Sequence, residues 1–138
     1  MNDTTYDKLL PEPTPDTQPF WDGLKAGKVM LQSCADCGKV RHYPRPVCPY
    51  CHSMQARWRE ASGRGQVHTW TIAHHPFHPG FKADLPYTLV TVDLEEGVRM
   101  QVQLRGAAPE GGLRIGLPVR IAFEPVTKDV TLPVCVIE

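Results

Sequence analysis

Hydrophobic positions are scarce at the start of the chain. Residues 1–15 contain three prolines and little periodic pattern of apolar positions. Such a segment buries too little apolar surface to offset the entropy that is lost when it is ordered. We therefore predict that residues 1–15 form a flexible arm.

The first periodic pattern follows this arm and predicts a short helix. Asp16 can act as its N-cap, and Phe20, Trp21 and Leu24 give it one apolar side. Gly27 ends the pattern, so we expect about three turns. A short strand should then lead to the first cysteine.

From residue 65 onward the pattern changes to alternation of apolar and polar positions or to short apolar runs, which predicts strands. A longer link, residues 105–117, separates the third strand from the fourth. Five strands with a link at this point are typical of an oligonucleotide/oligosaccharide-binding (OB) barrel. The predicted strands are residues 66–73, 87–94, 98–104, 118–124 and 131–138.

Four of the five cysteines lie in two Cys-x-x-Cys pairs that ten residues separate: Cys34, Cys37, Cys48 and Cys51. Each pair can place both sulfurs on one side of a tight turn, and Gly38 permits the backbone that such a turn uses. Four thiolates in tetrahedral geometry form a closed structural zinc site. We therefore predict one structural Zn²⁺ per chain, with no open position for a substrate.

Other roles for these cysteines remain open at this point. Rubredoxin-type iron binds the same set of four thiolates, and His42 or His52 could replace one of them. Two disulfides would require an oxidising compartment. Cys135 lies within an apolar run and is interpreted as a small buried strand residue.

The composition restricts the class of protein. Fifteen basic residues balance fifteen acidic ones, so no overall charge attracts nucleic acid or an anionic membrane. No run reaches the roughly 18 to 20 apolar residues that span a bilayer, and the acidic N-terminus lacks the features of a secretory signal. We expect a cytoplasmic protein with reduced thiols. Between Gly38 and Gly65, however, six basic residues face one acid, Glu60, which suits either an anionic partner or a solvated face.

The order of several segments resembles a known family. These are the aromatic helix PFWDGLKAGKV, the lead-in LQSCADCGKV, the second cysteine turn YPRPVCPYC, the joint SGRGQV and the block HHPFHPGF with LPYTLVTVDLEEGVRM. Together they resemble the zinc-ribbon/OB-fold, acyl-CoA-associated proteins that accompany thiolase-like enzymes. The resemblance covers most of the chain after the arm.

The resemblance implies a mainly β fold with three parts. A short N-terminal helix and a rubredoxin-like zinc ribbon would occupy residues 16–62, and a five-stranded OB barrel residues 63–138. It also implies a non-catalytic accessory subunit that binds a thiolase, acyltransferase or side-chain aldolase, with acyl-CoA at or near the interface. The partner would carry the catalytic groups.

Two sets of side chains are candidates for contact with CoA or with the partner. Guanidinium groups form bidentate bonds to phosphate, which favours arginines near the cysteines. The loop after the first barrel strand offers aromatic anchors and histidines. The two sets are Arg41, Arg45, Arg57 and Arg59, and His75, Phe77, His78 and Phe81.

Two other functions are weighed against this one. A single-stranded nucleic-acid-binding module would need aromatic platforms along a basic groove, but only Tyr87 is aromatic among residues 87–104. A salt-dependent shift of labelled DNA would favour it. An independent enzyme would need turnover by the isolated chain that depends on His75.

Overall fold

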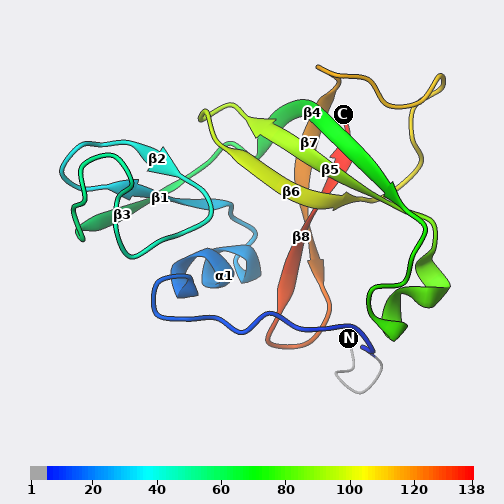
Figure 1. Cartoon of the computed structure of the whole chain (residues 1–138), viewed down its shortest axis with the longest axis horizontal. Helices are drawn as coiled ribbons and strands as arrows, with labels where there is room; N and C mark the ends of the chain where they lie inside the picture. Colours follow the sequence, from blue (N-terminus) through cyan, green and yellow to red (C-terminus); the bar gives the residue numbers. More distant parts are fainter. Residues whose placement is uncertain (1–5) are drawn as a thin grey trace.

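The computed structural model describes residues 6–138. Figure 1 shows a ribbon at one end of the long axis, a barrel at the other and a helix beside the junction between them. This arrangement confirms the predicted mainly β fold with an N-terminal helix, a cysteine ribbon and a five-stranded barrel. The elements are α1 (Gln18–Lys25), β1 (Met30–Cys34), β2 (Val40–Arg41), β3 (Ala56–Glu60), β4 (Arg64–Ala73), the 3-10 helix η2 (Pro79–Asp84), β5 (Tyr87–Leu94), β6 (Arg99–Leu104), β7 (Pro118–Pro125) and β8 (Thr131–Ile137).

Helix α1 is shorter than the sequence predicted. It has 8 residues, about two turns, and its N-cap is Thr17. The backbone N–H groups of Thr17 and Gln18 both donate to Thr14 O, at 3.0 and 2.8 Å. A separate turn therefore precedes the helix, and the prediction that Asp16 is the N-cap was wrong. The buried Phe20 and Leu24 form the predicted apolar side.

Strand β1 is the centre of a three-stranded ribbon sheet, with β2 and β3 antiparallel on its two sides. Its pairing with β3 begins at Met30 opposite Glu60 and ends at Cys34 opposite Ala56. The cysteine that ends β1 is thus held by a paired strand rather than by a free loop.

The other five strands close into a barrel in the order β4-β5-β6-β8-β7. The pairs are antiparallel except for β6 and β8, whose parallel pairing covers only Gln103 with Val134 and Leu104 with Cys135. Strand β5 alternates as predicted, since every second residue from Val90 to Leu94 is buried. Beside this short pairing, side chains of α1 and the ribbon line a pocket together with side chains of β6 and β8.

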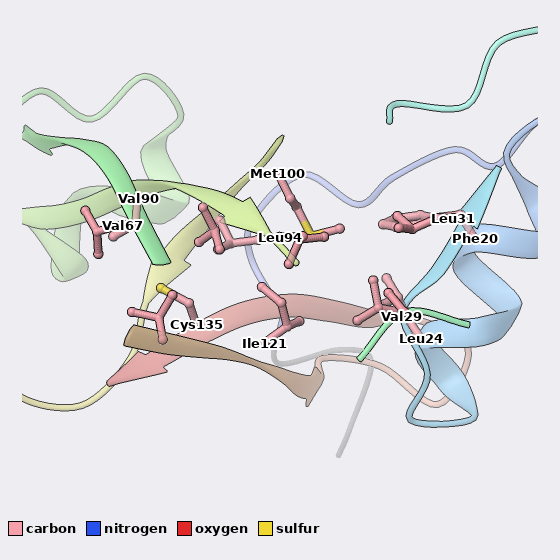
Figure 2. Packing of buried hydrophobic residues seen from close by; sticks show 14 of the residues in the cluster. Phe20, Leu24, Val29, Leu31, Val67, Val90, Leu94, Met100, Ile121 and Cys135 are labelled. Atoms are coloured by element: carbon pink, nitrogen blue, oxygen red, sulfur yellow. The ribbon is translucent and has the colours of Figure 1, made fainter. Parts of the chain in front are cut away.

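Helix, ribbon and barrel share one hydrophobic core. Figure 2 shows Phe20 of α1 and Leu31 of β1 facing Met100 and Leu94 of the barrel. Leu31 is 0% exposed and Met100 is 1% exposed. Because these side chains complete one another's packing, the ribbon cannot swing away from the barrel without exposing apolar surface to water.

Part of the predicted arm lies against the barrel. Residues 1–5 are outside the described residues, and residues 6–15 run past the β7–β8 hairpin toward α1 (Figure 1). Lys8 Nζ lies 3.0 Å from a carboxylate oxygen of Asp84 and 5.5 Å from the ring centroid of Phe81. The flexibility of the arm and the domain boundaries stay predictions. Within residues 6–138, no helix has the length and apolar character needed to cross a membrane.

Candidate functional site

The four predicted metal ligands meet at one end of the ribbon. All four cysteine Sγ atoms lie within 4.8 Å of one another. Cys34 Sγ is 3.5 Å from Cys51 Sγ, and Cys37 Sγ is 3.7 Å from Cys48 Sγ. Four sulfurs placed tetrahedrally about 2.3 Å from one ion would be about 3.8 Å apart. The cluster therefore has the dimensions of a tetrathiolate metal site.

Each cysteine pair is followed by a residue with left-handed backbone. Gly38 has φ of 78° and donates its N–H to Cys34 O, while His52 has φ of 65° and donates to Cys48 O. The first turn uses glycine, which adopts this conformation without strain, as predicted. The second turn uses histidine in the same role, which the sequence pattern did not reveal.

Backbone N–H groups point at the sulfurs that are most buried. The N–H groups of Cys37 and Asp36 each lie 3.4 Å from Cys34 Sγ. These donors lower the pKa of Cys34 to about 6, because they stabilise the thiolate. Tyr50 N similarly lies 3.4 Å from Cys48 Sγ. A metal ion binds thiolates, so the turns prepare the sulfurs for a cation.

The donor set fits a structural zinc ion. Four sulfur ligands would fill the coordination shell and leave no position for water or substrate, so the ion would stabilise the ribbon rather than react. The same four thiolates fit iron. Neither His42 nor His52 belongs to the cluster of ligand atoms found among residues 6–138.

The four candidate arginines do not form one patch. Arg41 pairs with Gln32 of β1, whereas Arg57 and Arg59 of β3 pair with Ser33 and Leu31. Side chains alternate between the two faces of a sheet, so Arg41 lies on the face opposite to the other two. Arg41 is buried and Arg45, Arg57 and Arg59 are exposed.

The candidate loop residues form a second surface. Phe77 is 80% exposed, and the His75 ring meets it edge-on with 4.9 Å between centroids. His78 Nδ1 accepts a hydrogen bond from Gly80 N at 3.0 Å, and Phe81 packs on Tyr87. Figure 1 places this loop and η2 at the opposite end of the molecule from the ribbon. One small ligand could therefore not contact both candidate sets.

An apolar pocket lies where α1, the ribbon and the barrel meet. Its volume is about 250 Å³, and Phe20, Trp21, Met100 and Pro133 are among the side chains that line it. His42 also lines it and packs against Phe20, with 5.1 Å between ring centroids. Burial lowers the pKa of His42 to about 4, so its imidazole is neutral near pH 7.

Replacing His42 by phenylalanine is expected to make the folded protein less sensitive to acid. The pKa of His42 is about 4 in the fold, against 6.5 when exposed. Between these values the unfolded chain binds a proton that the folded chain does not, so stability falls as the pH drops from 6.5 toward 4. In urea unfolding at pH 7.5 and 5.0, the wild type should lose about 2 kcal/mol more than His42→Phe. Equal losses would contradict the assignment.

Sequence reasoning missed one polar cluster on the barrel. Asp93 accepts from Arg99 Nε at 2.7 Å with one carboxylate oxygen, and its other oxygen lies 3.2 Å from His68 Nδ1. Asp93 and Arg99 are directly paired residues of β5 and β6. The sequence did contain a signal for this pair, because Asp93 and Arg99 have opposite charges and lie on the two sides of the predicted hairpin turn.

Two family profiles match the chain in sequence. One describes the rubredoxin-like zinc ribbon domain of ChsH2 and matches residues 21–55. The other describes the C-terminal OB-fold domain of ChsH2 and matches residues 58–124. The first match covers most of α1 with β1, β2 and all four cysteines, and the second runs from within β3 almost to the end of β7 and leaves out β8.

Several curated proteins are similar to this chain. A probable enoyl-CoA hydratase alpha subunit of Thermomonospora curvata is 40% identical over 83% of the chain, and a 3-oxo-4,17-pregnadiene-20-carboxyl-CoA hydratase alpha subunit of Mycobacterium tuberculosis is 41% identical over 83%. The chain spans only 35% and 36% of these two proteins. A DUF35 domain-containing scaffold protein of Pyrococcus furiosus is 34% identical, with 66% of each chain covered.

Solved structures agree with these matches. The structure described as Ltp2-ChsH2(DUF35) aldolase contains a chain that is 37% identical, with a TM-score of 0.81 and coverage of 93% of this chain and 98% of that one. A DUF35 protein of unknown function from Sulfolobus solfataricus is 17% identical, covers 90% and 86%, has a TM-score of 0.61 and supports the fold alone. The resemblance seen in the sequence is thereby confirmed, and the chain belongs to the ChsH2/DUF35 family of zinc-ribbon and OB-fold proteins.

Proposed function

We propose that this protein is a non-catalytic accessory subunit that binds and activates a thiolase-like enzyme. The partner would be a thiolase, an acyltransferase or a side-chain aldolase that acts on acyl-CoA thioesters, and this chain would help to dock the CoA substrate. The observation that carries the proposal is the match along 98% of a chain in the structure described as an Ltp2-ChsH2(DUF35) aldolase. The scaffold and alpha-subunit names of other relatives support it.

The exposed apolar side chains support a protein partner. On the ribbon, Tyr50 and Met54 are 63% and 71% exposed, and Tyr43 and Val47 are exposed beside them in sequence. Phe77 is exposed at the other end of the molecule. Aromatic side chains and methionine are enriched in the cores of protein interfaces. Two such surfaces at opposite ends suit a partner at least as large as this chain.

The loop histidines are better suited to binding than to catalysis. His78 uses Nδ1 to accept from the backbone of Gly80. The nearby Asp84 carboxylate is paired with Lys8 rather than with an imidazole. The bond from Gly80 N occupies the lone pair of His78 Nδ1, so the neutral ring carries its proton on Nε2 and has no free lone pair with which to take up a proton.

Co-expression with the partner tests the proposal. A tagged chain should retain a thiolase-like enzyme that mass spectrometry identifies, and the two should co-elute in gel filtration. The enzyme should be markedly more active in the complex than alone. Full activity of the enzyme alone together with no stable complex would refute the proposal. Turnover by the isolated chain that is lost in His75→Ala would favour an independent enzyme instead.

Truncating Phe77 is expected to weaken this complex. An exposed aromatic anchor that becomes buried at an interface contributes about 2 kcal/mol or more, so Phe77→Ala should raise the Kd about 30-fold. Ile115→Ala is the matched control, since Ile115 is 76% exposed but lies in the link between β6 and β7. Titration calorimetry with the purified partner measures the Kd of both variants. If Phe77→Ala and the wild type bound the partner with equal affinity, the loop around Phe77 would not be part of the interface.

A further inference from the structure

Unsatisfied polar atoms concentrate at two consecutive residues of the ribbon. Within residues 6–138, four buried side-chain nitrogen or oxygen atoms have no hydrogen-bond partner: Arg41 Nη1, His42 Nδ1, His42 Nε2 and Glu96 Oε1. Three of the four belong to Arg41 and His42. Buried polar atoms are normally paired, so a cluster of exceptions calls for a partner from outside the chain.

The guanidinium of Arg41 is buried without a counter-ion. Arg41 is 6% exposed. Its Nε donates to Gln32 Oε1 at 2.7 Å and its Nη2 to Arg45 O at 3.1 Å, and both acceptors are neutral. A charge taken out of water is normally compensated by an opposite charge. Among residues 6–138, no carboxylate is a hydrogen-bond or ion-pair partner of Arg41.

The same contacts fix Arg45 in place. Gln32 is 3% exposed, and its amide accepts from Arg45 N at 2.8 Å and donates to Arg45 O at 3.0 Å. Together with the bond from Arg41, these bonds hold the Arg45 backbone from three directions. A buried glutamine and a buried arginine thus fix the backbone from which the exposed Arg45 side chain extends.

Arg41 and Arg45 line a groove between the ribbon and the barrel. Its volume is about 380 Å³, and its wall also includes His42, Tyr50 and Arg99. Figure 1 shows the β5–β6 hairpin turn reaching toward the ribbon on this side. Of the carboxylates in the described part of the chain, Asp93 alone lines the groove, and it is already paired with Arg99 and His68. Three guanidinium groups and one carboxylate therefore line the groove, and the charges of Arg41 and Arg45 have no carboxylate partner there.

We propose that this groove binds the phosphate group of a small molecule. The three guanidinium groups come from β2, from the loop that follows it and from β6, so they approach from different directions. A tetrahedral phosphate can accept hydrogen bonds from several sides, whereas a planar carboxylate is matched by a single arginine. Arg45 and Arg99 make the direct contacts, and Arg41 contributes its charge from the buried wall, where screening by water is weak.

The inference deepens the proposed function, because a phosphate-bearing substrate of the partner enzyme would be docked here. The test of this inference does not require the partner enzyme. Phosphate binding is measured on the isolated chain, so its failure is distinguishable from the absence of a complex.

The test follows the amide and guanidinium NMR signals of the zinc-loaded chain in phosphate-free buffer at constant ionic strength. Inorganic phosphate and adenosine 3′,5′-bisphosphate are titrated separately, with chloride as the reference salt. Both should shift the Arg41 Nε–H signal and the backbone signals of Arg45 and Arg99. Tighter binding of the bisphosphate would assign a nucleotide ligand, and equal binding a simple phosphate.

Substitutions of single arginines test whether phosphate binding depends on this groove or on basic residues in general. Arg45→Gln is expected to weaken binding at least about 10-fold, the loss of one charge-assisted hydrogen bond, and Arg41→Gln to weaken it similarly. Arg57→Gln, on the opposite face of the ribbon sheet, is the matched control and should bind as the wild type does. Because Arg45 and Arg57 are exposed, both variants should fold even if Arg41→Gln does not. No shift at 10 mM of either probe, or an equal loss in Arg57→Gln, would overturn the proposal. The proposal would also be overturned if Arg45→Gln lost binding to the partner enzyme but kept binding to phosphate. That result would assign the groove to a carboxylate of the partner protein.

Discussion

Chelation of the metal is expected to unfold the cysteine ribbon and to destabilise the barrel that it covers. Zinc bound by four thiolates contributes roughly 10–16 kcal/mol to folding, which is as large as the whole stability of a typical domain. Outside the cluster, the ribbon sheet has only a two-residue β2 and a five-residue β3 beside β1. Without the metal, these short pairings cannot offset the entropy of ordering the two cysteine turns.

Elemental analysis and NMR would measure this effect. The purified protein should contain about one zinc per chain, and a strong chelator should collapse the ribbon amide signals while adding zinc restores them. Cys48→Ser should reproduce the loss. Cys135→Ala is the matched control, because Cys135 is buried in β8 away from the cluster and its variant should keep a full complement of zinc. Persistent ribbon signals after complete metal removal would contradict a structural role, and a red protein would indicate iron.

The cysteine cluster could be predicted because its information is local. Each Cys-x-x-Cys pair with its following turn specifies its own geometry, and Gly38 has the left-handed backbone that the pattern requires. The five barrel strands could be predicted for the same reason, since alternation in a segment such as Tyr87–Leu94 reports which side is buried. Neither prediction needed to know which strand pairs with which.

The arrangement of the candidate arginines could not be predicted in this way. Arg41, Arg57 and Arg59 all lie near cysteines in the sequence, but the pairing of β2 and β3 with β1 decides the face on which each one lies. A shift of one residue in that pairing would exchange the faces. The burial of His42 depends likewise on α1 and the barrel closing over it. Long-range contacts set both, and no local pattern encodes them.

Leu31→Ala is expected to destabilise the whole protein, although Leu31 belongs to the ribbon. Leu31 is completely buried in the core that α1, β1 and the barrel share. Removing its side chain should cost about 2–5 kcal/mol, from the lost burial and the cavity left behind. Ile115→Ala is the matched control, since its exposed side chain should change the unfolding free energy by less than about 0.5 kcal/mol.

Urea unfolding followed by NMR would show how far this effect extends. If the core is shared, amides of β1 and of β5 should lose their folded signals in one transition, and Leu31→Ala should move both midpoints together while the zinc content stays unchanged. Two separate transitions, with that of β5 unaffected by the substitution, would instead make the ribbon and the barrel independent units. A single transition would also mean that the shared core stays closed as long as either part is folded. The metal cluster, the groove beside Arg41 and the loop around Phe77 would then keep fixed relative positions, so a partner bound at both ends would meet a surface that is already in place rather than one that it must assemble.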